Sequence, residues 1–109
     1  MKTLYCALTL ALSPPLATAG ERVHVKYRGE VDLAPFACRD IAHSSIVERL
    51  CYDQKGHYVV VRLTGTYYHY CEVPADVVKR WRGAESMGRF FNANVKGNFD
   101  CRTHRVPSY

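Results

Sequence analysis

The sequence predicts a small α+β domain: an antiparallel β-meander of three strands plus an N-terminal strand, covered by two short C-terminal helices. Three observations support this class. Three segments of strand character follow one another along the chain, and the connections between them are too short to join parallel strands. Two segments with helical spacing of apolar residues come next. A stretch of alternating apolar and polar residues near the N-terminus indicates the remaining strand.

The N-terminal strand is predicted at residues 23–28, where apolar and polar side chains alternate. Gly29 ends this strand. Residues 31–38, which include Pro35, predict an extended lead-in, and residues 40–46 predict a short helical turn or a loop. This part of the chain therefore contributes one strand to the predicted sheet.

The meander is predicted in the middle of the chain. Residues 48–52 form its first strand, and residues 57–63, rich in β-branched side chains, form its second. A tight connection at residues 64–65 leads to a third strand at 66–73. Because side chains alternate along a strand, Tyr68 and Tyr70 share one face of it. The opposite face carries the odd-numbered residues of the strand: Tyr67, His69, Cys71 and Val73.

The two helices are predicted after Pro74, which ends the sheet and suits the first turn of a helix over 75–82. Apolar residues fall on one face of this helix: Val77, Val78 and Trp81. Ser86 is the predicted cap of the second helix. Its apolar residues also recur at helical spacing: Met87, Phe90, Phe91 and Val95. Gly88 in its first turn lowers helix stability, which indicates a close backbone approach there.

The first nineteen residues have the pattern of a secretory signal peptide. A positive start at Lys2 precedes an apolar stretch at 3–12, and small residues at 17–19 predict cleavage after Ala19. The apolar stretch is shorter than the roughly 20 residues that span a bilayer. We therefore expect a periplasmic or extracellular protein of residues 20–109 that does not span a membrane and forms one domain.

Four cysteines remain after cleavage: Cys38, Cys51, Cys71 and Cys101. An even number of cysteines in an exported chain predicts two disulfides. A four-cysteine zinc site is disfavoured because the chain has no C-x-x-C pair, and no metal or cofactor is predicted. Spacing alone does not choose among the three pairings; we favour Cys38–Cys101 and Cys51–Cys71.

The charge of the chain is unevenly distributed. Its formal net charge is +5, and residues 79–105 carry seven basic residues against two acidic ones. This region offers either a solvated basic face or a surface for a polyanion such as a nucleic acid, an acidic polysaccharide or an anionic membrane.

Five short stretches follow the pattern of a known family: Ser44-Ser-Ile46, Cys51-Tyr-Asp53, Val59-Val-Val-Arg-Leu63, Tyr68-His-Tyr70 before Val73-Pro74, and Ser86-Met-Gly-Arg-Phe-Phe-Asn92. Through them, residues 44–96 resemble the KTSC domain, named for the C-terminus of some lysyl-tRNA synthetases. The resemblance implies a compact α+β module with no established chemistry, and its tie to a synthetase hints at nucleic-acid contact. With this resemblance, the mature chain is divided into an N-terminal strand and lead-in at 20–43, a KTSC-like domain at 44–97 and a disulfide-tied C-terminal tail at 98–109.

The first candidate site is the run that contains Ser86, Gly88, Arg89 and Asn92. Backbone N–H groups at a helix start, a glycine that permits close approach and a nearby arginine form a plausible anion site. The alternative is purely structural: a capping serine, a packing glycine, and an arginine paired with Asp53 or Glu72.

Aromatic and histidine residues supply the other candidates. Tyr68 and Tyr70 would stack on bases or sugar rings if exposed, or would pack in the core. Four histidines are candidates for acid–base catalysis, His43, His57, His69 and His104, and the enzyme alternative would use His69 or His104. His69 and Glu72, however, are predicted to point to opposite faces of their strand.

We therefore expect a small, monomeric exported binding or accessory module, not an enzyme, with an anionic or sugar-bearing ligand. The alternatives are a secreted RNA- or glycan-cleaving enzyme and a structural partner protein of the cell envelope.

Overall fold

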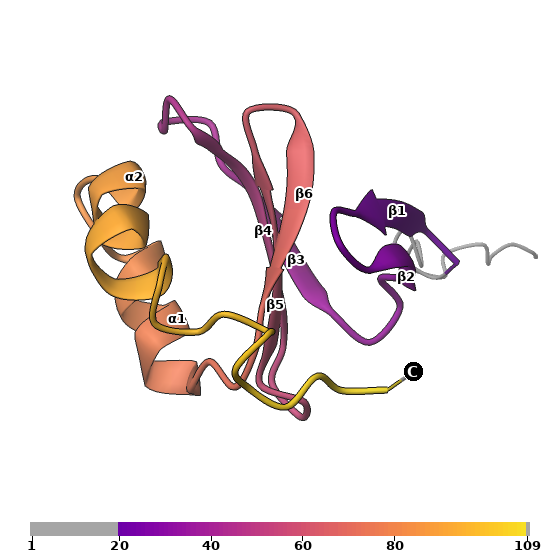
Figure 1. The fold of residues 1–109 in the computed structure, drawn as a ribbon. Coiled ribbons are helices and arrows are strands. Elements are labelled where there is room, and N and C mark those ends of the chain that lie inside the picture. The colour runs from indigo at the N-terminus through magenta and orange to yellow at the C-terminus, as the bar shows by residue number, and fades with distance from the viewer. Residues whose placement is uncertain (1–19, 109) are drawn as a thin grey trace, which may run out of the picture.

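The computed structural model describes residues 20–108, so the predicted signal peptide lies outside the described residues. It shows a six-stranded sheet with helices packed against one face (Figure 1). The strands are β1 (Arg22–Val25), β2 (Gly29–Asp32), β3 (Ala37–Asp40), β4 (Val47–Asp53), β5 (Tyr58–Leu63) and β6 (Thr66–Tyr70). The helices are α1 (Ala75–Arg82) and α2 (Met87–Phe90), and α2 continues into a π-helical turn, η2 (Phe91–Val95). The predicted α+β class is confirmed.

The predicted antiparallel meander is β4, β5 and β6. Each strand pairs with the next, so that Cys51 lies opposite Val60, and Val60 lies opposite His69 on the other side. β6 ends at Tyr70 rather than at residue 73, because the positive φ of 57° at Glu72 interrupts the regular pairing with β5, although the Val73 backbone N–H still donates to the carbonyl oxygen of His57 at 2.8 Å.

The sheet contains two strands more than predicted. The expected lead-in at 31–38 overlaps β2 and β3, and residues 41–46 form a loop rather than a helical turn. β2 pairs antiparallel with β1, and β3 pairs antiparallel with β4. β1 joins the meander through one parallel pair, Val25 with Tyr67. The strand order is therefore β2-β1-β6-β5-β4-β3.

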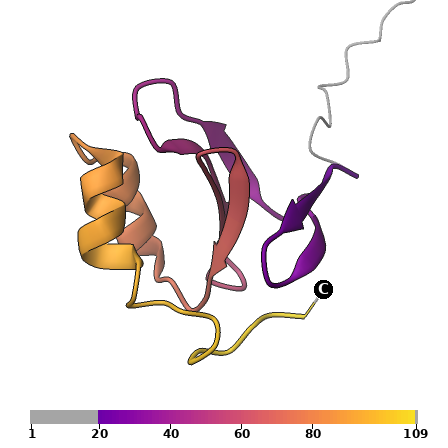
Figure 2. The ribbon, with the colours of Figure 1, turned by 45° about the horizontal axis from the view of Figure 1, so that its top comes forward.

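Buried side chains form a core on each face of the sheet. The helices cover one face, and Figure 2 shows the β1–β2 hairpin on the opposite side from them. The helix-side core contains Val47, Leu50, Tyr52, Val59, Val61, Val73, Val77, Val78, Trp81, Met87, Phe91 and Val95. The hairpin-side core contains Val25, Val31, Leu33, Phe36, Cys51, Tyr58, Val60 and Cys71. Because β4 and β5 are covered on both faces, they are almost continuously buried.

The two disulfides are Cys38–Cys51 and Cys71–Cys101, so the favoured pairing of Cys38 with Cys101 and of Cys51 with Cys71 is wrong. Cys38 and Cys51 lie directly opposite each other across the β3–β4 pair. Cys51 and Cys71 are separated by β5. Two strand spacings are about 10 Å, which is beyond the reach of a disulfide.

No helix within residues 20–108 has both the length and the apolar character needed to cross a membrane.

Candidate functional site

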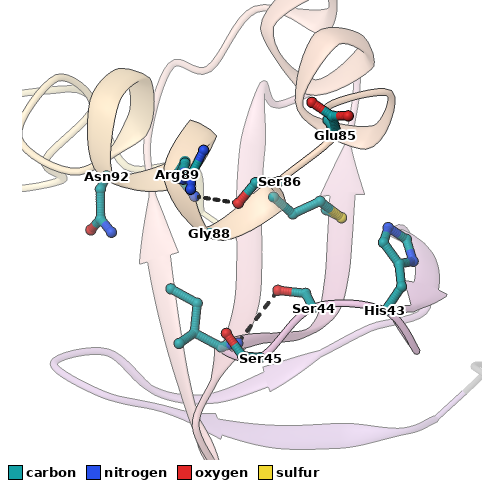
Figure 3. A pocket seen from close by; sticks show the side chains of 10 residues that line it. His43, Ser44, Ser45, Glu85, Ser86, Gly88, Arg89 and Asn92 are labelled. Carbon is teal, nitrogen blue, oxygen red and sulfur yellow. Dashed lines mark hydrogen bonds between the residues drawn. The ribbon is translucent and has the colours of Figure 1, made fainter.

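The loop before β4 and the start of α2 enclose a shallow pocket of about 450 Å³, called here the polar hollow (Figure 3). Its lining residues are His43, Ser44, Ser45, Ile46, Glu85, Ser86, Met87, Gly88, Arg89 and Asn92. Four of the predicted site residues therefore lie together: Ser86, Gly88, Arg89 and Asn92. The polar hollow joins two segments that are about 40 residues apart in the sequence.

Serine hydroxyl groups stabilise the backbone conformation of both walls of the polar hollow. The Ser86 hydroxyl accepts a hydrogen bond from the backbone N–H of Arg89 at 3.2 Å, which makes Ser86 the N-cap of α2 as predicted. The Ser44 hydroxyl accepts from the backbone N–H of Val47 at 3.0 Å. Each of these two hydroxyl groups therefore stabilises its own segment. The other polar side chains, at the rim, are the ones placed to contact a ligand.

Arg89 is exposed and forms no ion pair with any carboxylate of residues 20–108. The alternative pairing with Asp53 or Glu72 is therefore wrong. Asp53 is buried at the end of β4. The Glu72 carboxylate accepts from the Arg105 backbone N–H at 3.0 Å and lies 3.6 Å from the Arg105 guanidinium. The guanidinium of Arg89 thus stays available at the rim of the polar hollow.

Charge is divided along the polar hollow. Figure 3 shows Arg89 and Asn92 toward one end, and His43 and Glu85 toward the other. All four side chains belong to exposed residues. An anionic group is therefore favoured at the Arg89 end and disfavoured near the carboxylate of Glu85.

Sequence reasoning missed His43, Ser45 and Glu85 as lining residues. The stretch Ser44-Ser-Ile46, one of those shared with the KTSC domain, was the signal that pointed to this loop. Its approach to α2 is a tertiary contact that local sequence patterns do not report.

Tyr68 and Tyr70, the predicted stacking residues, do not line the polar hollow. Both are half-buried and pack against the helix-side core. The Tyr70 ring meets the Phe91 ring edge-on, with centroids 5.5 Å apart. Burial raises the pKa of Tyr70 to about 12. These tyrosines therefore belong to the packing between β6 and the helices.

His69 and His104 each contact a group other than Glu72. Nδ1 of His69 lies 2.7 Å from the Tyr58 hydroxyl, and burial lowers the pKa of His69. Nδ1 of His104 lies 2.9 Å from the carbonyl oxygen of Asp100. The structure therefore does not bring His69 and Glu72 together as a catalytic pair.

One group of side chains has metal-ligand character. Ligand atoms of His69, Cys71 and Cys101 lie within 4.8 Å of one another. Cys71 and Cys101 are bonded to each other, so their sulfurs are not thiolate ligands in this state.

Comparisons with known proteins identify the family of this chain. The KTSC domain family matches residues 43–99, which include both walls of the polar hollow. A protein of Tsukamurella paurometabola is 43% identical over 58 residues, covering 51% of this chain and 85% of that protein. The crystal structure of a KTSC domain protein from Yersinia pestis superposes with a TM-score of 0.56 at 26% identity, covering 60% of this chain and 92% of that one. Because the family match extends over more than half of the sequence, this chain belongs to the KTSC domain family.

Proposed function

We propose that this protein is a small exported binding module that takes an anionic or sugar-bearing ligand in the polar hollow. The observation that carries the proposal is the unpaired guanidinium of Arg89 at the rim of a pocket lined mostly by polar residues. A planar guanidinium suits carboxylate, phosphate and sulfate groups, because two of its N–H groups can donate to the same anion.

Neighbouring side chains add hydrogen-bonding capacity. Within residues 20–108, the side chains of His43, Ser45 and Asn92 make no internal hydrogen bond, and all three residues are exposed. A hydroxyl, an amide and an imidazole can each donate and accept. This combination suits a sugar that carries an acidic group, because the sugar hydroxyls also donate and accept.

Export is the second part of the proposal. Two disulfides are compatible with an oxidising compartment. Non-reducing mass spectrometry of protein from the exported fraction of its host should find a chain that starts at Gly20 and carries both bonds. An uncleaved chain with free thiols in the cytosol would contradict export and favour nucleic-acid binding.

The binding proposal is tested with oxidised protein of residues 20–109 on heparin, RNA and purified cell-wall polysaccharides in low salt, where electrostatic contacts are strongest. We expect at least one polymer to bind and to shift the amide NMR signals of Ser45, Arg89 and Asn92. Arg89→Gln should weaken that binding about tenfold, which corresponds to the loss of one charge-assisted contact.

The matched control is Lys96→Gln, which removes one exposed positive charge outside the polar hollow. This variant should bind almost as the parent protein does. Equal losses in Arg89→Gln and Lys96→Gln would indicate diffuse attraction and contradict a site. Absence of detectable binding to all of the polymers would also overturn the proposal. Turnover of RNA or glycan would favour the enzyme alternative.

A further inference from the structure

A second group of cations lies where the end of α1 meets the edge of the sheet. The guanidinium Nη2 of Arg82 donates to the carbonyl oxygen of Ala37 in β3 at 3.3 Å. Arg39 follows two residues later in the same strand, so its side chain lies on the same face as that of Ala37. Their partners in β4, Leu50 and Tyr52, belong to the helix-side core. Arg39 and Arg82 therefore both lie on the helix side of the edge strand, close enough for their charges to interact.

The Arg39–Arg82 pair has no counter-charge among residues 20–108. Neither guanidinium forms an ion pair with a carboxylate there. Nε of Arg82 is buried and has no hydrogen-bond partner. Burial lowers the pKa of Arg82, and the nearby charge of Arg39 lowers it further. The two positive charges therefore repel each other, and an anion supplied from outside the chain would stabilise this arrangement.

The position of Arg82 in its helix does not explain this arrangement. A cation in the last turn is stabilised by the helix dipole, but that effect does not need a side chain that extends to another strand and buries Nε. Glu85 lies three residues further along the chain and is exposed, yet it does not pair with Arg82. The positive charge is therefore left open to a ligand from outside the chain.

We propose that the Arg39–Arg82 pair binds a tetrahedral oxyanion, a phosphate or sulfate group, separately from the polar hollow. Two guanidinium groups present their N–H donors in planar forks that match such an oxyanion. The bound group would accept hydrogen bonds from the terminal Nη groups of the two arginines and neutralise the repulsion between them. Lys79, three residues before Arg82 on α1, adds positive charge on the same side of the helix.

The test follows the arginine Nε–Hε NMR signals of oxidised protein of residues 20–109 during separate titrations with inorganic phosphate and inorganic sulfate. Sodium chloride keeps the ionic strength constant. We expect a saturable shift of the Arg82 signal. The anion with the lower dissociation constant is the group that the site prefers. Arg39→Gln should raise the dissociation constant at least tenfold. Arg82→Lys, which keeps the charge but loses the planar fork, should also weaken binding.

The control is Arg80→Gln, which removes the same type of charge from the same helix, where Arg80 forms an exposed pair with Asp76 and lies 5.9 Å from the centroid of the Phe90 ring. It should leave the dissociation constant within about twofold, because exposed pairs contribute little. Because Arg39 is exposed, its replacement should preserve the fold, which the amide spectrum checks.

Three results would overturn the proposal: no saturable shift with either anion, unchanged binding by Arg39→Gln, or loss of binding in Arg89→Gln. The last result would place the anion in the polar hollow. Unchanged binding by Arg89→Gln, together with loss in Arg39→Gln, would support a separate site whatever the outcome of the polymer experiments.

Discussion

Gly88 lies so close to Ile46 that an ideal Cβ on residue 88 would be 3.0 Å from both Cγ1 and Cδ1 of the isoleucine. This contact joins the first turn of α2 to the loop before β4, which are the two walls of the polar hollow. The sequence predicted a close approach at Gly88, and the structure shows that the group approaching this glycine is the Ile46 side chain. A larger residue here would push the two walls apart.

The first prediction concerns this contact. Gly88→Ala should lower the free energy of unfolding by about 1 kcal/mol, because crowding of Ile46 outweighs the gain in helix propensity. Ile46→Val, which removes Cδ1, should cost about 1 kcal/mol alone. The double variant should lose less than the sum of the two, because the space left by Cδ1 accepts the new methyl group. Urea denaturation of the four proteins measures this coupling, and simple additivity would contradict the packing argument.

Local patterns were sufficient to predict the meander and the first helix. The predicted helix at 75–82 has the same bounds as α1. β2 and β3 could not be predicted because their sequences carry little strand signal: Gly29–Asp32 contains one β-branched side chain, Val31, and Ala37–Asp40 contains none. Its extended form depends on pairing with β4. Whether a segment forms a strand depends on its neighbours as well as on its own sequence, and for β3 the neighbour is β4.

The candidate site shows the same limit. The run from Ser86 to Asn92 was predicted because a cap, a glycine and an arginine are visible in one short stretch. Its opposite wall, with His43 and Ser45, comes from a tertiary contact. Tyr68 and Tyr70 were placed on one face correctly, but alternation does not say which face the helices cover. The disulfide pairing likewise depends on the strand order, which local patterns leave open.

The second prediction separates the two disulfides, which join cysteines 13 and 30 residues apart. Removing Cys38–Cys51 by alanine substitution should cost about 3 kcal/mol, and removing Cys71–Cys101 somewhat more, because the longer loop gains more entropy on unfolding. Only the second change should free the tail, where the Cys71 backbone N–H donates to the carbonyl oxygen of Phe99 at 2.9 Å. Urea denaturation gives the free energies, and hydrogen exchange of the backbone amide of residue 71, whether cysteine or alanine, reports whether the tail stays attached. Equal exchange in both variants would show that the disulfide does not hold the tail in place.

The third prediction concerns the ion pair between Glu21 and Arg49. The guanidinium donates to both carboxylate oxygens, at 2.7 and 3.1 Å, and these hydrogen bonds lower the pKa of Glu21. A lowered carboxyl pKa stabilises the fold above the unfolded value of about 4.3, and this stability is lost as pH falls through the folded pKa. Glu21→Gln should therefore cost about 1 kcal/mol at pH 7, the upper range for a partly exposed pair.

That cost should shrink progressively below pH 4.3 or so, where the parent protein takes up the proton on Glu21. Thermal denaturation of both proteins across this range measures it. Glu30→Gln, a control on an exposed carboxylate of β2 without an ion pair in residues 20–108, should cost little at pH 7. A cost for Glu21→Gln that stays constant in acid would mean that the amide disturbs packing rather than charge.

The fourth prediction concerns His69. Burial, and then the positive charge of Arg28, lower its pKa, while Asp100 acts in the opposite direction. Below about pH 6.5 the unfolded chain therefore binds more protons at this residue than the folded chain does. Stability should fall as pH drops from about 6.5 to the folded pKa of His69, and this contribution should then level off. His69→Asn, which keeps a hydrogen-bonding group near Tyr58, should flatten the slope in that window. NMR titration of the ring measures the pKa directly, and a value at or above 6.5 would show that the imidazolium is accommodated beside Arg28, contrary to the burial argument.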